Sequence, residues 1–299
     1  MTMIIKIALR TKMKRLIVLF SVLAGIYACT AMPDNEETTP PSDWEWFSVS
    51  FEKAAEPGTR IFLNEDYKIR WNKDDRVSVF NKTSFNRQYS FTGEDGASSG
   101  TIKKVGTVFN TGVEISQVYA VYPYSAANSI GEDDEILSLT FPQEQTYLEN
   151  SFGRGANLMI SVSEGVDNNL FFKNAGGFFL FKLYGKDVSV SSIVLTGNDS
   201  EPLSGPAKVT ATPNSAPSVK MSPDASPSVS LFCNPPVTLG ESADNYTSFY
   251  LVIPPTKFKN GFSLVISGDG GTFVKNSSKT IEVPRNNIIP MVPLKVSFD

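Results

Sequence analysis

The chain contains many short segments in which apolar and polar residues alternate. In residues 46–51, Phe47, Val49 and Phe51 fall on one side and serines on the other. A period of two over four to eight residues predicts a β-strand with one buried face. Comparable alternating or apolar runs, bounded by turn residues, recur at residues 76–80, 118–122, 136–141, 178–184, 249–253 and 294–298. No stretch of about a dozen residues shows helical periodicity with caps, so the pattern predicts an all-β sandwich architecture.

Two pairs of these segments match at nearly the same spacing. Residues 118–123, VYAVYP, resemble residues 249–254, FYLVIP, at an offset of 131. The apolar face of residues 47–51 aligns with that of residues 179–183 at an offset of 132. The agreement of the two offsets predicts two β-sandwich domains of similar plan, over residues 44–167 and 168–299. One large sandwich is the alternative for a chain of this length.

Residues 13–29, MKRLIVLFSVLAGIYAC, have the layout of a secretory signal. Lys14 and Arg15 precede an apolar core, and Ala28 stands directly before Cys29. This layout predicts a signal peptide over residues 1–28 and lipidation of Cys29, with palmitate among the acyl groups. A plain signal peptide and a retained membrane helix are the alternatives, although the apolar core is shorter than the roughly 20 residues of a span. Translation starts at either residue 1 or residue 13.

The segment after the signal is acidic and rich in proline. Residues 29–43 show no apolar periodicity, and we expect a lipidated N-terminus followed by a flexible linker. The whole chain has a formal net charge of −4, and five of its 27 basic residues lie in the signal. The mature chain therefore carries a net charge of −9. This acidity argues against nucleic acid and anionic lipid as partners.

The composition also argues against an enzyme. The chain has no histidine, which removes the usual nucleophile pairs and histidine-based metal sites. Lipidation of Cys29 leaves Cys233 alone, and a small core residue is the expected role for it. The acids at residues 74–75 and 132–135 lie in polar turns, where solvation is a simpler explanation than glycoside hydrolysis or calcium binding. We predict no catalytic residue, no metal site and no cofactor.

Several segments in a fixed order resemble the fimbrillin family of Bacteroidetes lipoproteins. The first domain supplies residues 59–60, TR, residues 69–71, IRW, residues 74–80, DDRVSVF, and residues 118–124, VYAVYPY. The second supplies residues 172–177, FKNAGG, residues 192–198, SIVLTGN, residues 203–205, LSG, and residues 250–254, YLVIP. The resemblance covers nearly all of the mature chain. One departure is Asp74-Asp75, where Gly-Asp is the commoner pair in the family.

The resemblance implies two tandem transthyretin-like sandwiches and a lipoprotein delivered to the outer membrane. It also implies a place as a structural or anchor subunit in a surface fimbrium, or pilus, that acts in adhesion. The expected partners are other fimbrial subunits, in a homopolymer or heteropolymer, the outer membrane through the lipid, and a host protein or glycan.

The resemblance further implies assembly by β-strand donation. In stalk subunits of the family a protease cuts after an arginine early in the first domain, and Arg60 is the matching residue. The cut would displace the strand that holds Phe47, Val49 and Phe51. A terminal strand of another subunit would fill the groove, and here its apolar face consists of Leu294, Val296 and Phe298. The alternative is that both terminal strands pair within their own domains, as in an anchor subunit that keeps its lipid.

A surface glycan-binding lipoprotein is the alternative function. Exposed aromatic rings stack on sugars through their apolar faces. The candidates are Trp44, Trp46, Trp71, Tyr122 and Tyr124.

Overall fold

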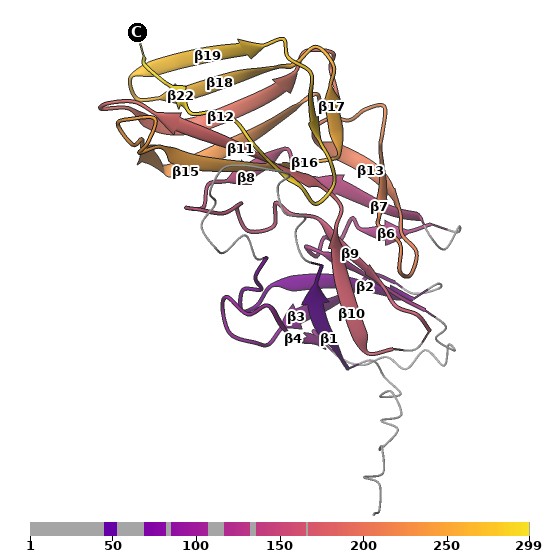
Figure 1. Cartoon of the computed structure of the whole chain (residues 1–299). Coiled ribbons are helices and arrows are strands. Elements are labelled where there is room, and N and C mark those ends of the chain that lie inside the picture. Colours follow the sequence, from indigo (N-terminus) through magenta and orange to yellow (C-terminus); the bar gives the residue numbers. More distant parts are fainter. Residues whose placement is uncertain are drawn as a thin grey trace, which may run out of the picture. The chain divides into compact units, whose positions relative to one another are not determined.

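The computed structural model describes residues 45–52, 69–81, 85–106, 117–131, 136–165 and 167–298. Every regular secondary-structure element within these ranges is a β-strand, which confirms the all-β prediction (Figure 1). The predicted signal peptide, the linker, Cys29 and Arg60 lie outside the described residues. In the described part of the chain, no helix is long and apolar enough to cross a membrane.

A closed barrel forms the first part of the fold. Its strands follow the order β1-β10-β9-β5-β2-β3-β4. They are β1 (Trp46–Phe51), β2 (Arg76–Asn81), β3 (Arg87–Phe91), β4 (Ser99–Lys104), β5 (Val118–Tyr122), β9 (Met159–Val162) and β10 (Asn169–Asn174). Trp71 is fully buried inside the barrel, where its ring stacks on Phe91 at 5.2 Å between centroids.

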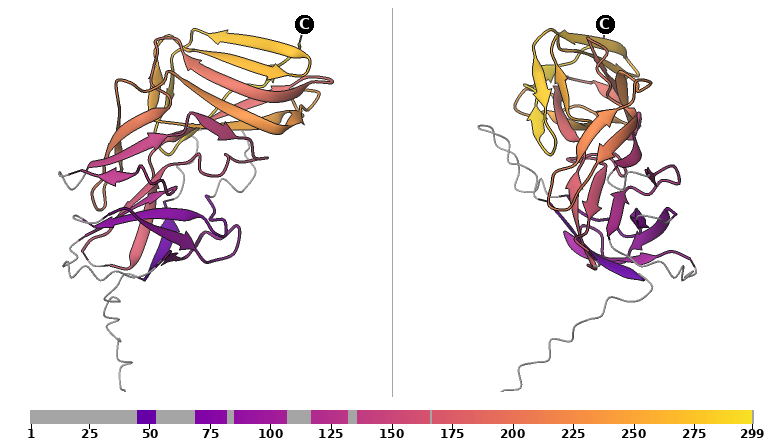
Figure 2. Two further views of the ribbon diagram at one scale, coloured as in Figure 1. Left: turned by 180° about the vertical axis from the view of Figure 1, so that it is seen from behind. Right: turned by 90° about the vertical axis from the view of Figure 1, so that its right-hand side faces the viewer.

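Two larger sheets stack on each other in the C-terminal part (Figures 1 and 2). The first joins β16 (Thr247–Ile253), β11 (Gly177–Tyr184) and β21 (Ile288–Pro290), with β22 (Leu294–Lys295) also on β11. The second follows the order β19 (Gly271–Ser277), β18 (Phe262–Gly268), β12 (Ser189–Gly197), β15 (Ser228–Thr238) and β8 (Glu144–Thr146). The largest apolar core lies between them and includes Phe179, Phe249 and Phe262.

A third sheet packs against the outside of the barrel. It consists of β14 (Ser218–Met221), β13 (Gly205–Thr210), β7 (Ile136–Phe141) and β6 (Ser129–Ile130). Leu137, Leu139 and Val209 of this sheet share a core with Tyr119 and Val121 of β5. A small pair of strands, β17 (Thr256–Phe258) and β20 (Ile281–Val283), completes the described elements.

Several strands are buried on both faces, and the sequences of β5 and β11 explain why. Every residue of β5, VYAVY, is buried, with alternate side chains facing the barrel interior and the third sheet. In β11, GFFLFKLY, Phe179 faces the main C-terminal core, while Phe178 and Leu180 face a smaller core that also contains Tyr250. Continuous apolar runs are the pattern expected of such doubly covered strands.

Strand pairing crosses the boundary predicted between residues 167 and 168. The strand β10 follows this boundary, yet it pairs with β1 and β9 and completes the N-terminal barrel. In the other direction, β7 pairs with β13 and β8 pairs with β15. The strands related by the internal repeat also differ in their partners, because β11 pairs with β16 whereas β1 and β5 lie apart in the barrel. Local alternation predicts a strand but does not specify its partner.

Truncation of Phe179 tests the main C-terminal core. Its fully buried ring contacts the rings of Phe181, Phe258 and Phe262 at centroid distances of 4.6–6.0 Å. We expect Phe179→Ala to lower the free energy of unfolding by about 3–5 kcal/mol, measured by urea denaturation. The matched control is Phe171→Ala on β10, where the ring is 49% exposed and the expected change is within about 0.5 kcal/mol. Equal losses for the two variants would contradict this assignment of the core.

Candidate functional site

The first strand closes the barrel. On one side β1 pairs in parallel with four residues of β10, from Ser48↔Asn169 to Phe51↔Phe172. On the other side it pairs antiparallel with five residues of β4, from Trp46↔Lys103 to Ser50↔Ser99. Its hydrogen-bonding groups are therefore engaged on both edges, and its removal would leave β4 and β10 with unpaired edges that face each other.

The inward side chains of β1 are part of the barrel core. Phe47 and Val49 are buried, as their alternation with serine predicts, and the Phe47 ring lies 5.5 Å from that of Tyr89. Phe51 is half-buried and stacks on Trp71 with 4.7 Å between the ring centroids. The three residues predicted to form a removable apolar face thus fill three successive places along the barrel wall.

An ion pair fixes the chain directly after β1. The carboxylate of Glu52 accepts two hydrogen bonds from the guanidinium of Arg285, at 2.5 and 3.1 Å, and one from the backbone N–H of Asn174. Arg285 also donates to the carbonyl oxygen of Asn174 at 2.8 Å. The side chains of Glu52 and Arg285 are only 14% and 22% exposed. Bidentate, charge-assisted bonds of this kind are among the strongest in proteins. They join the end of β1 to residues that follow β20.

The predicted donor segment lies in the C-terminal sandwich. β22 pairs in parallel with β11 at two positions, Leu183↔Leu294 and Tyr184↔Lys295, and the N–H of Val296 donates to the carbonyl of Tyr184 at 2.8 Å. Val296 is buried in the main core, whereas Leu294 and Phe298 are half-buried at its edge. Both terminal strands therefore pair within this chain, the arrangement named above as the alternative to donation.

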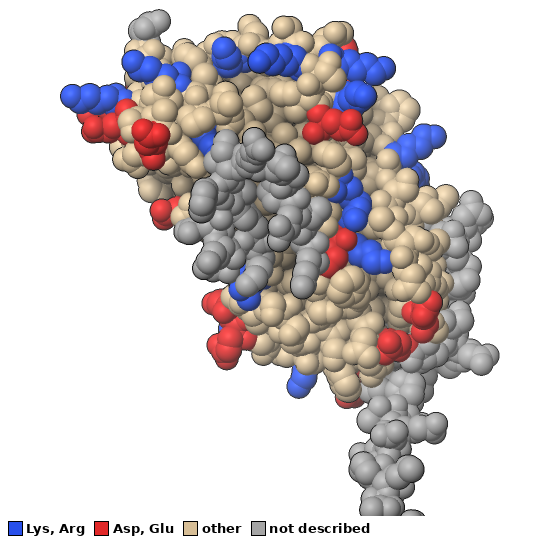
Figure 3. Space-filling view, in the orientation of Figure 1, with Lys and Arg blue, Asp and Glu red and all other residues tan. Residues whose placement is uncertain are grey.

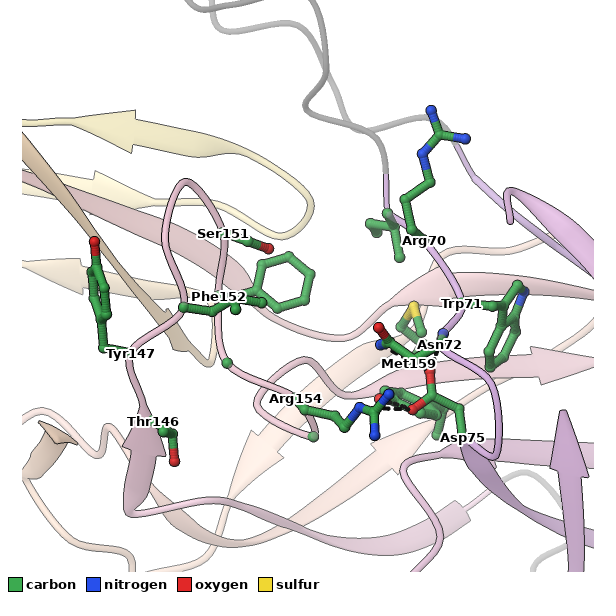
Figure 4. A pocket seen from close by; sticks show the side chains of 15 residues that line it. Arg70, Trp71, Asn72, Asp75, Thr146, Tyr147, Ser151, Phe152, Arg154 and Met159 are labelled. Atoms are coloured by element: carbon green, nitrogen blue, oxygen red, sulfur yellow. Dashed lines mark hydrogen bonds and ion pairs between the residues drawn. The ribbon is translucent and has the colours of Figure 1, made fainter. Parts of the chain in front are cut away.

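A pocket of about 560 Å³ opens between the barrel and residues 146–155 (Figure 4). Asn72, Asp75 and Arg154 lie close together on one side of it, and Phe152 points toward them from the opposite side (Figure 4). Trp71, Tyr122 and Met159 add apolar surface. The pocket is thus an aromatic cleft with one acidic side chain, Asp75, and two basic ones, Arg70 and Arg154.

Asp75 is buried in this pocket, contrary to the solvated turn predicted for it. Its carboxylate accepts hydrogen bonds from the backbone N–H of Asn72 at 2.8 Å and from the Tyr122 hydroxyl at 3.3 Å, and it lies 3.7 Å from Nε of Arg154. Burial raises the pKa of Asp75 above its usual value, and these bonds only partly offset the effect. Burial also raises the pKa of Tyr122, and the Asp75 charge adds to the shift. Asp74 has a φ of 65°, which explains why glycine suits this position.

The aromatic residues proposed to stack on glycans differ in their exposure. Trp71 and Tyr122 are buried, and the Trp71 ring faces are covered by Phe51 and Phe91. Their rings are therefore core and are closed to sugar stacking. Trp46 is 37% exposed, Tyr124 is half-buried, and Trp44 lies outside the described residues.

Other candidates for chemistry fit a structural role. Cys233 is buried, as predicted for a small core residue, and burial raises the pKa of its thiol to about 11. The described ranges contain no group of three His, Cys, Asp or Glu residues that could hold a metal ion. On the face drawn in Figure 3, basic and acidic side chains of the described residues are interspersed. The acids at residues 132–135 lie outside the described residues.

Comparison with protein-family models and with the sequences of curated proteins gives no match for this chain. Among solved structures, a proposed cell adhesion protein of Bacteroides ovatus is similar, with a TM-score of 0.51 and 13% identity over 84% of this chain and 91% of that chain. A proposed cell adhesion protein of Bacteroides uniformis gives a TM-score of 0.48, 11% identity and coverages of 84% and 93%. The tip fimbrial protein Mfa3 of Porphyromonas gingivalis gives a TM-score of 0.35, 11% identity and coverages of 82% and 94%.

The likeness to the Bacteroides ovatus protein establishes a shared fold. The family resemblance predicted from the sequence is therefore confirmed at the level of the fold.

The residues that sequence reasoning missed are Glu52 and Arg285, which lie 233 positions apart. No local pattern links them. The one available signal was an acid directly after an alternating strand.

The raised pKa of Asp75 predicts a specific pH dependence. Between the usual carboxyl value of 3.8 and the raised pKa, the folded state holds a proton that the unfolded chain releases. Stability therefore falls as pH rises through this window and levels off above it. Asp75→Asn cannot titrate, so the difference between the wild-type and Asp75→Asn free energies of unfolding should decline across the window. Urea unfolding from about pH 3.5 to 7 measures this.

The matched control is Asp74→Asn, because Asp74 is exposed and asparagine tolerates its positive φ. This variant should keep the wild-type pH profile. A constant difference between wild type and Asp75→Asn across the series would contradict the assignment.

Proposed function

We propose that this protein is a structural or anchor subunit of a surface fimbrium that acts in adhesion. The fold shared with a proposed adhesion protein and the fimbrillin-like sequence segments support this role. In this proposal the barrel and the C-terminal sheets are the counterparts of the family's two transthyretin-like sandwiches. Cys29 carries the lipid that holds the protein in the outer membrane, and the partners are other fimbrial subunits. The chain has no enzymatic role.

The observation that carries the proposal is the place of β1 in the barrel. It lies at the start of the described chain, it is hydrogen-bonded along both edges, and two of its side chains are buried in the core. Such a strand can be exchanged for another of the same pattern without changing the rest of the barrel. Main-chain bonds would supply the affinity and the alternate pockets the register, as in β-strand addition generally.

Cleavage after Arg60 would make the exchange possible. It would separate β1 from the rest of the chain, which continues through Ile69 and Trp71 into β2. Loss of the strand would expose two sheet edges and the pockets that hold Phe47 and Val49. Unpaired edges next to apolar pockets favour capture of another strand.

The C-terminal segment is the donor that this chain offers. Leu294, Val296 and Phe298 alternate with polar residues, as the residues of β1 do. In the isolated subunit they rest on β11. Donation requires that they leave this place and extend to a second subunit. An anchor subunit would instead keep β1 and the lipid. It would exchange a strand with another subunit only at its C-terminal end.

Substitution of Arg60 tests the stalk form of the proposal. We expect Arg60→Ala, expressed in the native cell, to abolish the mature N-terminus at Ile61 and the high-mass polymer ladder of unboiled samples. Mass spectrometry and immunoblotting measure the two effects. Arg70→Ala is the matched control, because it removes the next arginine along the chain, and it should leave both features unchanged.

The same measurements separate the two roles. A lipidated Cys29 on an uncut chain that copurifies with other subunits identifies an anchor. A protein that is always monomeric on the cell, with neither the Ile61 terminus nor any bound subunit, would overturn the proposed function.

A further inference from the structure

The segment of the first strand and the C-terminal segment of the chain have similar sequences, with three of six residues identical. Residues 47–52 read FSVSFE and residues 294–299 read LKVSFD. Valine, serine and phenylalanine are identical at the third to fifth positions, and an acid follows in both. In the structure the first segment is β1 with Glu52, whereas the second contains β22. Asp299 lies outside the described residues.

We infer that the C-terminal segment of a second copy of this chain occupies the place of β1 in one register, with Leu294 at the position of Phe47 and Asp299 at that of Glu52, and that Arg285 selects this register by binding the Asp299 carboxylate. The inference rests on the proposed function, which states that strands are exchanged. It adds the register of the incoming strand and the residue that selects this register.

The apolar face fits the barrel in this register. Val296 replaces Val49 without any change of side chain, and Phe298 replaces Phe51 on the face of Trp71. Leu294 takes the buried place of Phe47 beside Tyr89, with a smaller side chain. A slip of one residue would turn Lys295 or Ser297 into the core, because successive side chains of a strand point to opposite faces.

The polar face fits as well. Lys295 falls on Ser48, which is half-exposed, so its ammonium group can reach solvent. Pro293 falls on Trp46, the first residue of β1, which is 37% exposed. Proline is tolerated at the first position of a strand, where one missing N–H matters least.

Loss of Glu52 together with β1 would leave a binding site for a carboxylate. The guanidinium of Arg285 and the backbone N–H of Asn174 both donate to Glu52, and each would lose that acceptor. Asn174 is fully buried and Arg285 is largely so. A buried donor without an acceptor is unfavourable, and a buried cation without its partner is more so. An acid directly after the incoming strand restores both bonds.

Glu52 makes one further hydrogen bond through its backbone N–H, and this bond does not depend on its side chain. The N–H of Glu52 donates to the carbonyl of Phe172 at 2.8 Å, and the N–H of Asp299 can replace it. The place of Glu52 therefore offers one acceptor, the Phe172 carbonyl, and two donors, the Arg285 guanidinium and the Asn174 N–H. This set suits a residue with an acidic side chain. Serine and phenylalanine, which a slipped register would place there, supply no carboxylate.

A graft within the full chain tests the register without cleavage or assembly. Phe47→Leu, Ser48→Lys and Glu52→Asp together convert residues 47–52 into LKVSFD. We expect this in-register graft to unfold cooperatively in urea, with a midpoint close to that of the wild type. The shifted control carries LKVSFD at residues 46–51, which places lysine, serine and aspartate at the three inward positions, and it should lose the cooperative transition.

A second pair of variants tests the role of Arg285. The graft with Glu52→Asn in place of Glu52→Asp should unfold at a lower midpoint than the graft with aspartate. That difference should disappear in an Arg285→Gln background. Failure of the in-register graft to fold, a shifted graft as stable as the in-register one, or equal midpoints for aspartate and asparagine would each overturn the inference.

Peptide exchange tests the same contacts between separate chains. The full chain is nicked after Arg60 by an arginine-specific protease and mixed with a fluorescent peptide of residues 292–299, VPLKVSFD. Binding is followed by anisotropy. We expect the peptide with asparagine at the last position to bind about tenfold more weakly, and Arg285→Gln to remove that difference.

The outcomes separate the two proposals. Equal binding of the aspartate and asparagine peptides overturns the role of Arg285 and leaves strand exchange intact. Binding of neither peptide overturns strand donation by this segment, and with it both the proposed function in its stalk form and the inference.

Discussion

The fold depends on the pairing of one N-terminal strand along both of its edges. β1 lies between β4 and β10, and without it the barrel would be an open sheet with two free edges. Its backbone groups and two buried side chains close the core around Trp71. Because buried backbone groups must be hydrogen-bonded, any state that lacks β1 requires a replacement strand or exposure of the barrel interior to water.

This constraint reaches beyond the barrel. Glu52 connects the end of β1 to Arg285, so the barrel wall and the residues before β21 are held at one point. The third sheet adds a second connection, since β7 and β13 pack on the outer side chains of β5. The strands of the two predicted domains therefore interlock, and a change at β1 acts directly on a residue of the C-terminal part.

Sequence patterns predicted the strands better than their neighbours. The alternation of Phe47, Val49 and Phe51 correctly indicated an inward face, and the apolar residues from 178 to 184 correctly indicated a strand. The parallel pairing of β1 with β10, and the place of β10 in the barrel, came only from the structure. Pairing joins residues that are far apart in sequence, so it leaves no local pattern. The same reason explains why the burial of Asp75 and its contact with Arg154 were not foreseen.

The C-terminal segment has fewer strand pairings in its own sandwich than it would have in the place of β1, and this difference would give the proposed strand exchange a direction. In its own sandwich β22 pairs with β11 at two positions, and within the described residues it has no second neighbouring strand. In the proposed exchange residues 293–298 would take the place of β1, which makes five residue pairings with β4 and four with β10, and Asp299 would add an acid beside Arg285. More main-chain bonds and a partly buried ion pair favour the second place, whereas the tethered β1 holds that place in the uncut chain. In the proposed exchange, covalent attachment of β1 would keep the subunit closed, and removal of β1 would make the better-paired arrangement accessible.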